Sequence, residues 1–182
     1  MAVKTPRRLP KKLSSIAIVS GLCAVAIYLL LQPTLLSKST NKGNLSVYFS
    51  DTPHTVPLGQ SIPVEIRLRT GSTAINAAQI KLKYDPHVLD VIKMNTNQSF
   101  CSFYVANSFD TITGEVNLAC GSPNPGFTGD SVLIHLTMRA KGVGTTDLLL
   151  DPNATKILAN DGKGTSLLHS VPKVSITVRN SF

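Results

Sequence analysis

The stretch that most constrains the fold is residues 74–91, which read AINAAQIKLKYDPHVLDV. Its first half alternates apolar side chains, such as Leu82 and Tyr84, with polar ones, which is the period-2 pattern of a half-buried β-strand. Asp85 and Pro86 interrupt this pattern, because proline fixes its own φ and biases the preceding residue away from the α region. Apolar residues follow at once. The stretch therefore predicts a strand, a tight corner that closes one end of a core, and a returning strand.

The same alternation recurs along the rest of the chain after residue 44. Segments rich in Gly, Pro, Asn and Asp separate the alternating runs, as turns do. No helical pattern of ten or more residues appears among them, so the spacing predicts an all-β sandwich of about eight or nine strands. The candidate strands outside the first stretch lie at residues 45–50, 62–68, 100–106, 115–120, 132–138, 146–150, 156–159 and 174–178.

The N-terminus has a different composition. Residues 1–12 are basic, and the 19 residues 13–31 are mostly apolar, which as a helix would span about 28 Å. We therefore expect residues 13–36 to form a transmembrane anchor or a signal sequence, and residues 37–44 to be a solvated linker. Because basic flanks stay in the cytoplasm, residues 45–182 are predicted to lie on the extracytoplasmic side of a single-pass protein at the cell membrane. Cleavage of the N-terminus, which would release a secreted domain, remains the alternative.

The charge of the chain argues against nucleic acid as a partner. The formal net charge is +8, but seven of the 18 Lys and Arg residues lie in residues 1–44, where no Asp or Glu occurs. Residues 45–182 carry eleven basic residues against ten acidic ones. Because phosphate binding needs clustered basic side chains, a nearly neutral domain is not expected to bind nucleic acid.

Two cysteines lie on either side of a predicted turn. Cys101 and Cys120 fall on consecutive candidate strands that flank residues 110–114, so a hairpin would bring them together. In an oxidising compartment they would form a disulfide, worth about 3 kcal/mol in the chain-entropy model. Two free thiols in the core are the alternative. No Cys or His at metal-ligand spacing accompanies them, so no zinc site is expected.

Motifs of catalysis and cofactor binding are missing from the sequence. The four histidines are scattered, and neither H-E-x-x-H, G-x-S-x-G nor a phosphate-binding glycine loop occurs. Asp161 is the single carboxylate of an Asn-Asp-Gly turn, whereas calcium takes several oxygen ligands. The sequence therefore predicts a non-catalytic protein without a metal or a cofactor.

Four segments carry motifs in a particular order and spacing: 58–66 (LGQSIPVEI), 75–91 (INAAQIKLKYDPHVLDV), 114–117 (GEVN) and 140–146 (AKGVGTT). Together they resemble the motifs of a cohesin module, and the resemblance covers roughly residues 44–178. It implies a jelly-roll β-sandwich related in fold to some carbohydrate-binding modules. The apolar run described above adds one N-terminal transmembrane helix before this sandwich. The resemblance also implies a receptor function, because cohesins bind the dockerin modules of other proteins and so assemble carbohydrate-degrading complexes.

The polar side of the first stretch is the candidate docking face. It carries Ala77, Gln79, Lys81 and Lys83, which alternate with the core positions. The best-known cohesin group has Asn-x-Asp at the positions that Ala77 and Gln79 match. A small apolar residue and a neutral amide cannot make the same charged hydrogen bonds, so the resemblance implies a dockerin-like partner or a divergent one.

Direct contact with polysaccharide is the alternative function. Sugar binding usually relies on aromatic side chains that stack on sugar rings, and the chain has no Trp. Tyr48 and Tyr104 are the candidates for such stacking, because Tyr84 is expected to face the core. The shortage of aromatic residues favours a protein partner.

Overall fold

The computed structural model describes residues 45–50 and 52–180 of the chain. The expected basic segment, membrane segment and linker, residues 1–44, lie outside the described residues. Within the described residues, no helix has the length and apolar content needed to cross a membrane. All the described strands belong to one compact unit, Asn41–Phe182.

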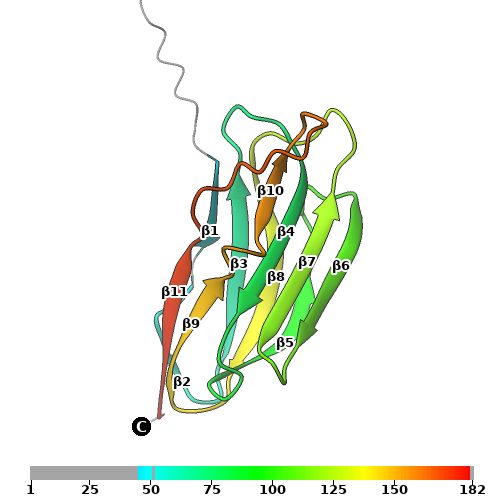
Figure 1. Cartoon of the computed structure of the whole chain (residues 1–182). Coiled ribbons are helices and arrows are strands. Elements are labelled where there is room, and N and C mark those ends of the chain that lie inside the picture. Colours follow the sequence, from blue (N-terminus) through cyan, green and yellow to red (C-terminus); the bar gives the residue numbers. More distant parts are fainter. Residues whose placement is uncertain (1–44, 51, 181–182) are drawn as a thin grey trace, which may run out of the picture. The chain divides into compact units, whose positions relative to one another are not determined.

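The described residues form eleven β-strands and no helix, arranged as two facing sheets (Figure 1). Neighbouring strands are antiparallel, except for the parallel pair of β2 and β11. The four-stranded sheet has the order β1 (Ser46–Ser50), β3 (Ser61–Arg69), β8 (Asp130–Ala140) and β5 (Leu89–Asn95). The seven-stranded sheet has the order β2 (Thr55–Pro57), β11 (Lys173–Arg179), β9 (Gly144–Leu150), β4 (Ile75–Lys83), β7 (Glu115–Gly121) and β6 (Phe103–Asp110), with β10 (Lys156–Ala159) also paired to β4.

The predicted all-β sandwich is confirmed, but the expected number of eight or nine strands is too low. The three residues of β2 are too few to show an alternating pattern. The strand expected at residues 100–106 begins only at Phe103 and continues to Asp110. Its later half is polar apart from Phe109 and lacks alternation, but from Ala106 to Asp110 the backbone stays paired with β7.

A single core fills the space between the two sheets. On β4 the inward side chains of Ile80 and Leu82 are fully buried, and Ile66 and Ile134 are fully buried on the opposite sheet. Burying a side chain of this size stabilises the fold by about 1.5–3 kcal/mol. The inward positions of β4 are therefore occupied by core side chains. Its outward positions do not pack in the core and are available for binding.

The corner after β4 has the predicted form. The Tyr84 N–H donates to the Gly114 carbonyl at 2.9 Å, which fixes the end of β4 against the β6–β7 turn. Asp85 then caps the turn, because its Oδ1 accepts the His87 N–H at 2.8 Å. Leu89 is completely buried at the start of β5, so the returning strand closes the end of the core, as the sequence indicates.

Candidate functional site

The four predicted docking residues all lie on the outer side of β4. Gln79 and Lys83 are exposed and Ala77 and Lys81 are half-buried, while the residues between them are buried. The alternation of β4 therefore puts these four side chains on one surface, as expected.

The outer side of β4 continues across three other strands. Gln79 lies opposite Lys156 on β10 and opposite Ala119 on β7. Two positions earlier, Ala77 lies opposite Leu158 on β10. Because residues that are opposite in an antiparallel pair share a face, β10, β4, β7 and the outer strand β6 present one continuous surface.

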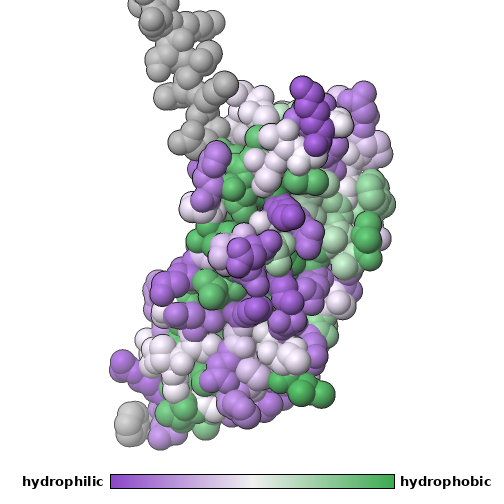
Figure 2. Space-filling model, in the orientation of Figure 1, coloured by the Kyte–Doolittle hydropathy of each residue, from purple (hydrophilic) through white to green (hydrophobic). Residues whose placement is uncertain are grey.

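Part of this surface is hollowed and apolar, and we call this part the apolar hollow. It has a volume of about 210 Å³, and two of its large side chains are well exposed, Phe103 at 52% and Val105 at 80%. In Figure 2 the hydrophobic colouring gathers on the side of the molecule formed by β7 and β6. The hollow is lined by Ala77, Ala78, Gln79, Phe103, Val105, Ala119, Cys120, Lys156 and Leu158.

An irregularity in β6 produces the exposure of these side chains. The register of β6 on β7 shifts between Tyr104 and Ala106, so Val105 is an extra residue, as in a β-bulge. Beside it, the Phe103 ring lies over Gly121, where an added Cβ would overlap the ring and lie 2.9 Å from its Cε1 atom. The bulge and the glycine together let two apolar side chains lie on the outer surface.

The other end of the β4 surface is a network of ion pairs, which we call the charged cluster: Lys81, Lys83, Glu115 and Asp151. Lys81 Nζ lies 3.1 Å from Glu115 Oε2. Lys83 Nζ lies 3.1 Å from Asp151 Oδ2 and 4.0 Å from Glu115 Oε1. The Asn153 backbone N–H and then Lys83 lower the pKa of Asp151. Lys81 and Lys83 therefore already have partners within the chain, and the predicted site divides into a neutral ionic half and an apolar half.

Lys156 is the basic side chain at the edge of the apolar hollow. It is exposed, and its side chain makes no ion pair or hydrogen bond to another residue in the described part of the chain. A lysine beside an apolar surface attracts a carboxylate and repels a second cation. The apolar hollow is thus suited to a group that combines apolar and acidic side chains.

The two tyrosines proposed for sugar stacking lie on different sheets. Tyr48 is on β1; its hydroxyl donates to Asp130 Oδ2 at 2.7 Å, and the Arg69 guanidinium lies 5.5 Å from the centre of its ring. Tyr104 is on β6, 37% exposed. The structure therefore does not bring them into one site. Tyr48 does line a hollow of about 390 Å³, together with Phe49, Thr52, His54, Pro172, Lys173 and Val174.

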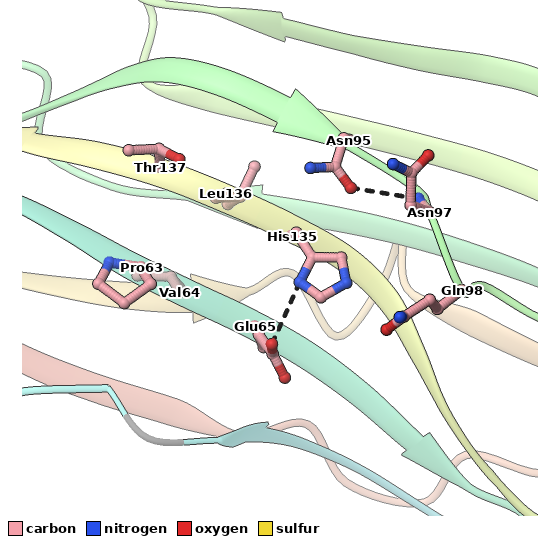
Figure 3. A pocket seen from close by; sticks show the side chains of 9 residues that line it. All are labelled: Pro63, Val64, Glu65, Asn95, Asn97, Gln98, His135, Leu136 and Thr137. Carbon is pink, nitrogen blue, oxygen red and sulfur yellow. Dashed lines mark hydrogen bonds and ion pairs between the residues drawn. The ribbon is translucent and has the colours of Figure 1, made fainter.

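A further hollow of about 380 Å³ lies on the outer face of the four-stranded sheet (Figure 3). In it, His135 Nδ1 lies 3.1 Å from Glu65 Oε1, and Asn95 Oδ1 accepts the Asn97 N–H at 3.1 Å. No aromatic ring of Phe, Tyr or Trp lines this hollow, so it offers hydrogen bonds but no stacking platform. Its lining is Pro63, Val64, Glu65, Asn95, Asn97, Gln98, His135, Leu136 and Thr137.

The two predicted disulfide partners meet next to the apolar hollow. Cys101 and Cys120 are at disulfide-bonding distance, with Cα atoms 5.8 Å apart. Cys101 lies in the loop before β6, not in a strand as expected, while Cys120 lies on β7. Among the residues that the structure describes, no group of three or more His, Cys, Asp or Glu side chains could hold a metal ion.

The geometry defines a class of protein: a two-sheet β-sandwich with an apolar hollow on the outer side of one sheet. The sequence assigns it more closely: the model of the cohesin domain matches residues 38–178, and the chain belongs to the cohesin family. No curated protein matches the sequence.

Solved cohesin structures share the fold at low sequence identity. The solution structure of CaCohA2 from Clostridium acetobutylicum has a TM-score of 0.60 and 16% identity, over 74% of this chain and 90% of that one. The seventh ScaB type I cohesin from Pseudobacteroides cellulosolvens has a TM-score of 0.60 and 20% identity, over 76% and 94%. The non-cellulosomal cohesin from Archaeoglobus fulgidus has a TM-score of 0.57 and 17% identity, over 75% and 92%.

Reasoning from the sequence missed most of the apolar hollow. Phe103, Val105, Lys156 and Leu158 are not adjacent to β4 in sequence, and only the register of three strand pairs brings them beside it. One signal was present: Phe103, Tyr104 and Val105 are three consecutive apolar residues where a half-buried strand should alternate. Such a run is consistent with a bulge on an outer strand.

Proposed function

We propose that this protein is a non-catalytic docking module that binds a dockerin-like protein module on the outer face of β10, β4, β7 and β6. The observation that carries the proposal is the apolar hollow, with Phe103 and Val105 exposed on a face that is otherwise polar. The buried centre of a protein interface is typically apolar and aromatic, with a polar rim. Solved relatives support the choice of partner, since the similar structures include a complex of CaDoc0917 with CaCohA2 and a type I cohesin–dockerin complex, Coh-OlpA–Doc918, from Clostridium thermocellum.

The side chains on this face indicate which side chains a partner would present to it. An apolar side chain of the partner would fill the hollow beside Phe103 and Val105, and an acidic one would meet Lys156. The charged cluster would form the rim, where ion pairs contribute mainly to orientation and association rate. Because Ala77 and Gln79 replace the Asn-x-Asp expected from the best-known cohesins, the centre of this interface is apolar, and we infer a divergent dockerin as partner.

A matched pair of substitutions tests this proposal. Val105→Asp puts a carboxylate into the apolar hollow, whereas Val143→Asp makes the same change at another exposed valine, 57% exposed, between β8 and β9. By titration calorimetry against dockerin modules of the source organism, Val105→Asp should weaken binding at least tenfold, about 1.4 kcal/mol. Val143→Asp should bind as the native chain does. Equal affinities of all three proteins would reject this face as the docking site.

Lys156 provides a second, electrostatic test of the same face. Lys156→Glu should lower the association rate and reverse the salt dependence of binding, because it replaces attraction of an acidic group by repulsion. Lys141→Glu, an exposed lysine after β8, is the control. An association rate that changes equally in both variants would show that only net charge matters.

We further propose that residues 13–36 remain as a membrane anchor and hold this module outside the cell. The support is the length of the apolar run and the basic segment before it. Protease added to intact cells should remove the domain and leave a membrane-held fragment of about residues 1–36. Full protection of the domain would reject this orientation, and a mature protein that starts near residue 37 would show cleavage and secretion.

Direct binding of polysaccharide is the second candidate function. The hollow beside Tyr48 favours it, because it combines two aromatic side chains with the polar side chains of His54 and Lys173. Against it stands the engagement of Tyr48 by Asp130 and Arg69, which leaves less of the ring free to stack on a sugar.

A further inference from the structure

Exposed apolar side chains concentrate on one strand. Nine large hydrophobic side chains are exposed in the described part of the chain, and five of them lie on β6 or in the turn that follows it. Docking at the apolar hollow uses only Phe103 and Val105. The other three, which need another explanation, are Tyr104 at 37%, Phe109 at 40% and Ile112 at 86% exposure.

β6 is also the last strand of its sheet. It pairs with β7 along one side, and no described strand pairs with its other side. Over the eight residues Phe103–Asp110, one row of backbone N–H and C=O groups therefore has no partner strand. Such an edge is a template for pairing with another chain.

The other outer strands of the two sheets have the usual protection. β2 has three residues and ends in Pro57, and β1 has only five residues. β5 carries two charged residues, Asp90 and Lys93. The sequence of β6, FYVANSFD, contains no Lys, Arg or Pro. β6 is thus the long outer strand that lacks the residues which normally prevent pairing.

We propose that β6 pairs antiparallel with β6 of a second copy of this chain, across a two-fold axis that passes beside Ser108. This residue is the centre of Ala106–Asp110, the regular part of the strand after the bulge. In this register Ala106 of each copy faces Asp110 of the other. The only charge on the strand then faces a small side chain, and no like charges are opposed. A two-fold contact of this kind makes every favourable interaction twice.

The same register accounts for the most exposed apolar side chain. Ile112 lies in the turn after β6, and the two-fold pairing would place this turn next to Tyr104 and Val105 of the second copy. In Figure 2 a hydrophobic spot lies at the lower end of the molecule, where Figure 1 shows β6 turning into β7. A strand pair of this length buries less surface than a standard interface, so the dimer should form at micromolar concentrations. The free edge and Ile112 do not belong to the apolar hollow, and of the two exposed side chains in the proposed docking site only Val105 takes part in this contact as well.

Cysteine cross-linking of the full chain tests the register directly. Opposite Cα atoms in an antiparallel pair are about 4.5–5.5 Å apart, within the range of a disulfide. Ser108→Cys should therefore give a covalent dimer on mild oxidation, visible on a non-reducing gel. Lys141→Cys, also exposed but in the loop after β8 and outside the proposed pairing, should give no covalent dimer, and neither should the native chain. Equal cross-linking of the two variants, or none in either, would overturn the proposed pairing.

Sedimentation equilibrium of the compact unit Asn41–Phe182 measures the association without an engineered thiol. This unit contains every described strand and core residue. The native unit should show a reversible dimer, Ile112→Lys should weaken it at least tenfold, and the control Ile92→Lys on β5 should not. Circular dichroism shows that each variant is folded. A native unit that stays monomeric up to a millimolar concentration would overturn the proposal, and an unchanged Ile112→Lys dimer would overturn the register.

Discussion

Tyr48 on β1 and Asp130 at the start of β8 are joined by a hydrogen bond of 2.7 Å that passes over β3, the strand between them. From β3 itself, Arg67 Nη2 lies 2.9 Å from Asp130 Oδ1 and Arg69 Nη2 lies 3.0 Å from Asp130 Oδ2. One carboxylate thus binds donors from two other strands and links the outer face of three of the four strands of this sheet. Tyr48 is therefore a structural residue, whatever else it does.

Replacing Asp130 should make the free energy of unfolding less sensitive to a fall in pH. The Tyr48 hydroxyl, Arg67 and Arg69 lower the pKa of Asp130. A lowered pKa in the folded state contributes stability that is present above the ordinary carboxylate pKa and is lost as the pH falls through the lowered value. Asp130→Asn should therefore cost about 1 kcal/mol at pH 7, the modest value expected at a partly exposed site, and almost nothing near pH 2. Urea unfolding at both pH values measures this, and an equal loss at both would contradict it.

Gly114 should tolerate no side chain. Its φ is +70°, and a Cβ would overlap the Tyr84 carbonyl oxygen and lie 2.9 Å from Pro86 Cδ. Gly114→Ala should therefore destabilise the protein by about 2–4 kcal/mol, since strain and overlap add. Gly162 has nearly the same φ, +69°, with nothing within 4 Å of its Cβ position. Gly162→Ala should cost only about 1 kcal/mol, and similar losses in thermal unfolding of both variants would show that overlap at the corner is unimportant.

The pairing of Cys101 with Cys120 remains a prediction about the protein in its own compartment. Peptide mass mapping without reduction should find the two joined, and alkylation of both under denaturing, non-reducing conditions would contradict this. Their sequence separation is 19 residues, so reduction should cost about 3 kcal/mol and lower the melting temperature by on the order of 10 °C. Cys101→Ser should melt at the same temperature with and without reductant.

A glycan array separates the two candidate functions. If sugars stack on the exposed rings, Tyr48→Ala or Tyr104→Ala should remove the signal, a loss of about 1 kcal/mol or more, while Gln79→Glu should not. Tyr48→Phe keeps the ring but removes the hydrogen bond to Asp130, so it distinguishes stacking from damage to the sheet. No glycan signal from the native domain, together with a protein partner that Gln79→Glu weakens, would favour docking. Lys81→Glu is a poor probe, because it would place a second carboxylate beside Glu115.

The fold was predictable because alternation is a local property. The burial of Leu82, Tyr84 and Leu89 could be predicted from the residues directly beside them in the sequence. The all-β class could be predicted because the alternating pattern recurs along the chain. The three-residue β2 and the late start of β6 were not predictable, because both depend on backbone pairing rather than on side-chain pattern.

The candidate site was predictable only along one strand. The outward positions of β4 follow from its alternation, but the neighbours of those positions depend on which strands pair with β4 and in which register. For this reason the sequence could not show that Lys81 is paired with Glu115, or that Val105 and Leu158 lie beside Ala77. Register is a tertiary property, and no pattern within a strand specifies its partner.

The alternation of β4 also constrains how this protein can evolve. Its even-numbered positions from Ala78 to Leu82 hold the core, and its odd-numbered positions from Ala77 to Lys83 form the outer surface. Point substitutions at odd positions can thus change the partner while the domain remains folded. Insertion or deletion of one residue would exchange the two sets and place Lys81 and Lys83 in the core. Divergence of recognition in this strand should therefore proceed by substitution at constant length, and length changes should be confined to the loops at its two ends.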